Sequence, residues 1–124
     1  MANPNIVAVT TILGTTTFLT PANTTANVLL SNAASSGLVF KINNIVAANT
    51  TGSAANTTVS IDNAAAGAGT DFPIVSAVSV PANASLIAVD KTTGFYLMEN
   101  QSIVVTSGTS SAITYTISYE SIAS

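Results

Sequence analysis

The sequence predicts an all-β domain, an antiparallel β-sandwich of about nine short strands. Val, Ile and Thr dominate the chain, whereas the good helix formers Leu, Glu, Lys, Gln and Arg are scarce. In several segments every second residue is apolar, and no apolar stripe follows the helical period of about 3.6 residues. Clusters of Gly, Ser and Thr separate these segments, as is typical of turns between strands.

The predicted strands follow one another at short intervals along the whole chain. Turn clusters such as Ser35-Ser36-Gly37 and Ser107-Gly108-Thr109 separate several of them. Pro73 has no backbone N–H to donate, so its segment is expected at the start of a strand or on a sheet edge. We predict strands at residues 6–13, 16–20, 27–31, 38–47, 57–62, 72–80, 85–91, 95–98 with 102–106, and 112–120.

The alternation is clearest in the last predicted strand. Successive side chains of a strand point to opposite faces of the sheet, so apolar residues at every second position share one face. We expect this face to belong to the core, because two Ile residues lie on it beside the two Tyr residues. The apolar set is Ile113, Tyr115, Ile117 and Tyr119, and the polar set is Thr114, Thr116, Ser118 and Glu120.

Residues 63–70 are mostly Ala and Gly, and none of their side chains is large enough to anchor the segment. We therefore expect a mobile surface loop. Asp62, Asn63 and Asp71 flank this loop and could offer oxygen ligands to calcium. They lack the alternating acidic spacing of an EF-hand, so we expect no metal site there.

The composition argues against catalysis. The chain contains no His, Cys, Trp or Arg, and its only basic side chains are Lys41 and Lys91. General acid–base chemistry, nucleophilic attack and transition-metal binding depend on residue types that are absent or scarce here. We expect a protein that is not an enzyme, that has no catalytic residues and that needs no cofactor or metal. Its function would then depend on its surfaces.

The charge balance also limits the partners. A net charge of −3 with two Lys residues offers little to neutralise phosphates, so nucleic acid is not an expected ligand. The apolar runs are shorter than the roughly 18 residues needed to cross a bilayer, and no basic residue precedes an apolar run at the N-terminus. We expect a single domain over residues 1–124, folded in a cytoplasm and not associated with a membrane.

Three parts of the chain carry a resemblance to a known group of proteins. They are the opening residues 1–7, the run from Ser35 to Asn43, and the run from Phe95 to Gly108 together with residues 117–120. These segments resemble small virion structural proteins of marine tailed phages, especially those infecting cyanobacteria, and the likeness covers nearly the whole chain. Residues 96–105 are also similar to a strand–turn–strand of viral jelly-roll proteins, in which Glu99-Asn100-Gln101 here replaces an acidic-Gly-Asp turn.

The resemblance implies a jelly-roll-like particle component, located in the virion and assembled in the host cytoplasm. The role we expect is that of a capsid decoration or cement protein, with the major capsid protein or another virion protein as its partner. We also expect a homo-oligomer, with a trimer among the arrangements. A tail, neck or fibre module is the first alternative, and a carbohydrate-binding β-sandwich is the alternative from another class.

The residues that we expect to contact the partner lie near the N-terminus. The apolar run that begins at Ile6 would form an exposed, adhesive sheet edge if nothing covered it. We expect residues 1–12 to form an extended arm and part of this arm to bind the particle. The predicted contact residues are Pro4, Asn5, Ile6 and Val7.

Overall fold

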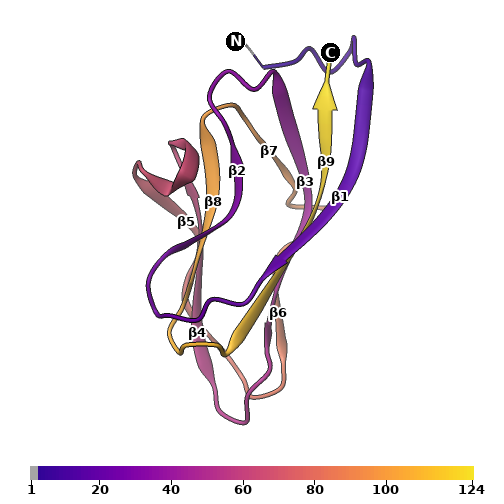
Figure 1. Ribbon diagram of the computed structural model, residues 1–124. Helices are drawn as coiled ribbons and strands as arrows, with labels where there is room; N and C mark the ends of the chain where they lie inside the picture. The colour runs from indigo at the N-terminus through magenta and orange to yellow at the C-terminus, as the bar shows by residue number, and fades with distance from the viewer. Residues whose placement is uncertain (1–2) are drawn as a thin grey trace.

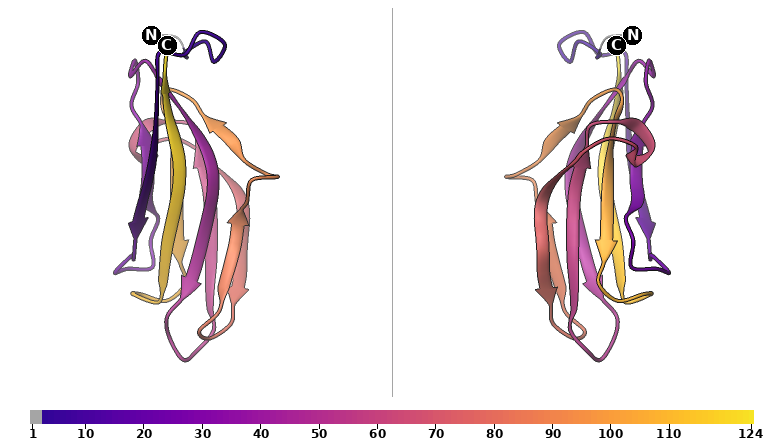
Figure 2. Two further views of the ribbon diagram at one scale, coloured as in Figure 1. Left: turned by 90° about the vertical axis from the view of Figure 1, so that its right-hand side faces the viewer. Right: turned by 90° about the vertical axis from the view of Figure 1, so that its left-hand side faces the viewer.

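Residues 3–124, which the computed structural model describes, form two antiparallel sheets packed face to face (Figure 1). The elements are β1 (Thr11–Leu19), β2 (Asn27–Asn32), β3 (Leu38–Asn49), β4 (Ala55–Asp62), the 3-10 turn η1 (Ala65–Gly67), β5 (Asp71–Val80), β6 (Ser85–Val89), β7 (Phe95–Leu97), β8 (Gln101–Ser107) and β9 (Ile113–Ala123). The first sheet has the order β1-β9-β3-β6, and β7 also pairs with β3. The second sheet has the order β2-β8-β4-β5. Figure 2 shows the first sheet in front on the left and the second in front on the right.

The path of the chain is that of a jelly roll. β1 lies in the first sheet and β2 in the second, β3 returns to the first, and β4 and β5 belong to the second. The chain then gives β6 and β7 to the first sheet, β8 to the second and β9 to the first. Each sheet is therefore assembled from distant parts of the sequence, as in the double-sheet jelly rolls. This confirms the predicted antiparallel, jelly-roll-like β-sandwich.

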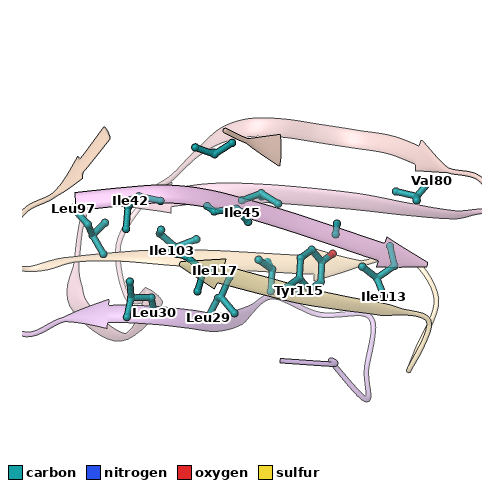
Figure 3. Packing of buried hydrophobic residues seen from close by; sticks show 14 of the residues in the cluster. Leu29, Leu30, Ile42, Ile45, Val80, Leu97, Ile103, Ile113, Tyr115 and Ile117 are labelled. Carbon is teal, nitrogen blue, oxygen red and sulfur yellow. The ribbon is translucent and has the colours of Figure 1, made fainter. Parts of the chain in front are cut away.

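The core lies between the inner faces of the two sheets. Ile113, Tyr115 and Ile117 are each 0% exposed, which confirms the predicted inward face of the last strand. Tyr119 is half-buried, and its ring centroid lies 5.0 Å from that of Phe40. The other fully buried side chains come from both sheets and include Val59 and Val105. Figure 3 shows four more of them, Ile42, Ile45, Leu97 and Ile103.

Two buried asparagines join the sheets, one at the end of β2 and one at the end of β3. Asn32 Nδ2, on β2, donates a hydrogen bond of 3.1 Å to the carbonyl of Leu97 on β7. Asn49 Nδ2, on β3, donates one of 3.0 Å to the carbonyl of Val80 on β5. Both side chains are at most 2% exposed, so each amide satisfies backbone groups that water cannot reach.

The N-terminal segment differs from the prediction. Residues 6–10 form turns and bends, not the first half of a strand, and the predicted strands 6–13 and 16–20 are replaced by the single strand β1. Gly14 does not interrupt β1, because it pairs with Glu120 in an unbroken register along β9. The predicted extended arm over residues 1–12 is therefore wrong for residues 3–12, and residues 1–2 lie outside the described part of the chain.

The turn between β7 and β8 depends on Asn100. This residue has a φ of 59°, in the left-handed region that Gly and Asn tolerate best. Its N–H donates to the carbonyl of Asn32 at 2.9 Å. Asn100 therefore takes the backbone conformation that a glycine would supply in an acidic-Gly-Asp turn.

The loop between β4 and β5 lies on the surface, as predicted, but it is anchored. Gly67 N donates to Ser102 Oγ at 3.0 Å, and Ala66 N donates to Ser31 Oγ at 3.2 Å. Ala65 N donates to Asn100 Oδ1 at 3.2 Å. The prediction of an unanchored loop is wrong because the backbone N–H groups, and not the small side chains, hold it to β2 and β8.

Candidate interaction surface

The described residues do not form a catalytic cleft. Within residues 3–124 there is no pocket, and no three side chains of the His, Cys, Asp and Glu types gather closely enough to hold a metal ion. The basic side chains Lys41 and Lys91 are both exposed, on β3 and in the turn after β6. No helix of this part of the chain is long and apolar enough to cross a bilayer.

The predicted contact residues form a protruding turn. Asn5 builds it, because its Oδ1 accepts a hydrogen bond from Val7 N at 2.9 Å and its carbonyl accepts one from Ala8 N at 3.0 Å. The turn directs the next two side chains outward, so that Ile6 is 51% and Val7 91% exposed. Pro4 is partly buried at its base.

Hydrogen bonds hold this turn to the body of the domain on both sides. Asn3 Oδ1 accepts from Glu99 N at 3.1 Å, which joins the segment to the turn between β7 and β8. Thr10 N donates to the carbonyl of Ala123 at 2.9 Å, which joins it to the end of β9. The turn is thus fixed at the end of the sandwich where the C-terminus lies (Figure 1).

A further apolar side chain lies at the same end. Met98, directly before Glu99 in the β7–β8 turn, is 44% exposed. Ile6, Val7 and Met98 form what we call the terminal patch. Sequence reasoning found its first two members but missed Met98, whose exposure follows from its position in a turn between two strands. Ile6 and Val7 are the members of the predicted contact set that are both apolar and well exposed.

The candidate calcium ligands are only partly brought together. Asp62 and Asp71 are directly opposite each other in the β4–β5 ladder. Asp62 is 0% exposed, and its Oδ1 accepts from Ala64 N at 2.8 Å and from Gly69 N at 2.9 Å. Asn63 Oδ1 accepts instead from Thr70 N at 2.8 Å. These side-chain oxygen atoms therefore accept hydrogen bonds from backbone N–H groups of the same loop.

The opposed carboxyl groups of Asp62 and Asp71 differ in proton affinity. Burial favours the neutral form of Asp62, but hydrogen bonds from Ala64, Asp71 and Gly69 outweigh it and hold the pKa of Asp62 below its ordinary value. The hydrogen bond shared with Asp62 is the main cause that raises the pKa of Asp71, and burial and the charge of Asp62 add to it. Asp71 is therefore the member of the pair that gains a proton first as the pH falls.

The exposed aromatic side chains do not form a platform for stacking a sugar. Phe18 on β1 is 72% exposed, Phe72 on β5 is 56% exposed and Tyr96 on β7 is 45% exposed. β1 is an edge strand of the first sheet, β7 lies beyond β3 toward the other edge, and β5 belongs to the second sheet. The three rings therefore occupy separate parts of the surface.

No protein-family model and no curated protein sequence matches the chain.

Proposed function

We propose that this protein is a capsid decoration or cement protein of a tailed phage, which binds the outer shell and stabilises it. The observation that carries the proposal is the terminal patch, a set of exposed apolar side chains whose N-terminal turn is hydrogen-bonded to the body of the domain at both ends. The jelly-roll fold is compatible with it, because this fold is common in viral capsid domains. The fold alone assigns no function, since lectins share it.

The geometry of the turn suits a binding role. An apolar residue that enters a pocket at the centre of an interface contributes far more to affinity than the polar rim around it. Val7 has the exposure that such an anchor needs, and the hydrogen bonds of Asn5 fix its position before binding. A preformed turn loses little conformational freedom on association, which favours affinity.

The particle contact would depend little on charge. The chain has seven charged side chains in total, two basic and five acidic. Exposed ion pairs contribute about 0–1 kcal/mol each. The binding free energy would therefore come mainly from two other sources. They are apolar burial at the terminal patch and hydrogen bonds from the surface, which is rich in Ser, Thr and Asn.

Two alternatives remain as proposals of second rank. A tail, neck or fibre module would use the same kind of surface at a site of lower copy number. A carbohydrate-binding domain would need aromatic side chains that stack on a sugar, and the separation of Phe18, Phe72 and Tyr96 weighs against a shared stacking surface.

Addition of the purified protein to particles that lack it tests the proposal. We expect the wild-type protein to cosediment with these particles and Val7→Asp to bind at least tenfold more weakly, because a charge would be buried without a partner. Ile87→Asp is the matched control, since Ile87 is 63% exposed on β6, away from the terminal end. Wild-type protein that does not bind would contradict the proposal. Equal binding by both variants would show that the terminal patch is not the binding surface.

A further inference from the structure

Most edge strands of the sandwich carry a feature that blocks pairing with another chain. β5 contains Pro73 and two register shifts against β4. β2 has a register shift between Val28 and Leu30, and its Ser31 accepts a hydrogen bond from η1. β6 is five residues long, and β7 has three. Prolines, bulges, short strands and covering segments are the usual means by which proteins protect sheet edges.

β1 carries none of these features. It is nine residues long, pairs with β9 in an unbroken register, and contains no proline and no charged residue. Its other edge pairs with no strand of residues 3–124. Three of its large apolar side chains are exposed, Ile12 by 55%, Leu13 by 60% and Phe18 by 72%. A long edge strand in regular register that carries exposed apolar side chains is expected to pair with another strand.

We propose that β1 pairs with β1 of a second copy of the chain, antiparallel about a twofold axis at Thr15. A twofold axis exchanges the two copies, so residue i of one strand faces residue j of the other whenever j faces i. At the axis itself, one residue of the strand therefore faces its own counterpart. Thr15 is the central residue of Thr11–Leu19. An axis at this position therefore pairs the full length of both strands.

This register matches Ile12 and Phe18, two of the three exposed apolar side chains of β1, to each other. With Thr15 on the axis, Ile12 faces Phe18 of the second copy, and Phe18 faces Ile12 of the second copy. Both residues lie on the outer face of the sheet, the face on which Thr16 Oγ1 contacts Ser118 Oγ at 3.0 Å. Directly opposed aromatic and β-branched side chains are a favourable cross-strand pair.

The pairing would also extend an apolar row that already crosses the first sheet. Val39 on β3 is opposite Ile122 on β9, and Ile122 is opposite Ile12 on β1. Val39 and Ile122 are 4% and 5% exposed, whereas Ile12 is left open at the edge. Phe18 of the second copy would cover Ile12 and complete the row.

The size and charge of this interface fit a second copy. A ladder of nine residues supplies about nine backbone hydrogen bonds, close to the roughly ten direct hydrogen bonds of a typical specific interface. At one hydrogen bond per about 100–200 Å², nine bonds correspond to roughly 900–1,800 Å², a range that overlaps the roughly 1,200–2,000 Å² of stable complexes. The chain has a net charge of −3, but β1 itself is uncharged, so two copies meet there without opposed like charges.

Sedimentation equilibrium of the isolated chain is the first test, and its result does not depend on the proposed function. We expect a monomer–dimer equilibrium for the wild-type protein and a dissociation constant at least tenfold higher for Phe18→Lys, which removes both Ile12–Phe18 pairs. Because Phe18 is exposed, the variant should keep the wild-type circular dichroism spectrum. A wild-type chain that is monomeric at all accessible concentrations would overturn the proposal.

Disulfide trapping tests the register, because the chain has no cysteine of its own. Directly opposed residues have Cα atoms about 4.5–5.5 Å apart, within the range that a disulfide spans. Thr15→Cys should therefore form a disulfide-linked dimer under mild oxidation. Thr17→Cys is the matched control, since it would face Leu13 of the second copy and lie about 13 Å along the strand from its own counterpart. Equal trapping of both variants, or none of Thr15→Cys, would contradict the register.

Discussion

The hydroxyl of Tyr115, on β9, donates a hydrogen bond of 2.9 Å across the core to the backbone carbonyl of Thr106, on β8. It also bonds to the hydroxyl of Thr57 on β4. Tyr115 is 0% exposed, so these bonds join the two sheets in the absence of water, and burial raises the pKa of the phenol. The single phenol thus fixes one sheet against the other.

We expect Tyr115→Phe to lower the free energy of unfolding by about 1–3 kcal/mol, because Thr57 and the Thr106 carbonyl would lose their buried partner. Tyr119→Phe is the matched control. Tyr119 packs its ring on Phe40, and its hydroxyl makes no hydrogen bond within residues 3–124, so its loss should be close to neutral. Urea denaturation of both variants measures the difference, and equal effects would contradict this role of Tyr115.

Truncation of the inward face of β9 should be costly. Ile117→Ala is expected to lower the free energy of unfolding by about 2–5 kcal/mol, since Ile117 is 0% exposed and its loss leaves a cavity. Thr116→Ala, on the opposite face of the same strand, should change it by about 0.5 kcal/mol or less. If thermal denaturation showed Thr116 to be the sensitive position, the facing of β9 would be inverted.

The carboxyl pair predicts a substitution that stabilises the protein at neutral pH. Asp71 has a raised pKa, so its contribution to stability is complete below its unfolded pKa of about 3.9 and is lost as the pH rises through its folded value. Asp71→Asn removes the negative charge opposite Asp62 and keeps a side chain of nearly the same shape. We expect a higher melting temperature at pH 7 and no gain below about pH 3.9, where the aspartate is already protonated.

The same change at Asp62 should act in the opposite direction. Because its pKa is lowered, the contribution of Asp62 is present above about pH 3.9 and is lost as the pH falls through its folded value. Asp62→Asn should therefore lower the melting temperature at pH 7. Two substitutions that shifted stability in the same direction would contradict the assigned difference between the carboxyl groups.

Attachment to the particle should resist salt. The terminal patch is apolar, and at about 1 M salt the Debye length is only about 3 Å, so exposed ion pairs would be screened while apolar contacts would persist. We expect purified virions to retain the protein after washing at this ionic strength. Complete release into the supernatant, measured by quantitative gel analysis, would indicate a contact based on charge.

The sequence was most informative where one strand's own pattern determined its facing. Alternation in residues 113–117 correctly predicted which side chains enter the core, and Pro73 does lie on an edge strand. Both features follow from local rules, namely the two-residue period of a strand and the missing N–H of proline. They need no knowledge of which strands are neighbours.

The errors occurred where individual hydrogen bonds, local or distant, override the pattern of residue types. Ile6 and Val7 suit a strand by composition, but the side chain of Asn5 closes a local turn that competes with strand pairing. Strands 6–13 and 16–20 were predicted as separate, yet pairing with β9 keeps β1 continuous over residues 11–19. The loop 63–70 is held by Ser31 and Ser102, whose proximity depends on the sheet order and cannot be deduced from residues 63–70 themselves.

The candidate site was predicted only in part, because contacts between distant parts of the chain complete it. Ile6 and Val7 are exposed, as a contact role requires, but no local pattern places Met98 at the same end. The hydrogen bond between Asn3 and Glu99 brings them together across most of the chain length. The exposed edge of β1 was likewise missed, because it depends on which strand lies at the border of the first sheet.

The copy number in purified virions tests the proposed decoration role most directly. A decoration protein follows the symmetry of the capsid lattice, so we expect a simple molar ratio to the major capsid protein in quantitative mass spectrometry of particles. A tail or fibre module would follow the lower symmetry of the tail and be far scarcer. A ratio well below that of the shell subunit would contradict the decoration role in favour of the tail, and absence from the particles would contradict any role in the virion.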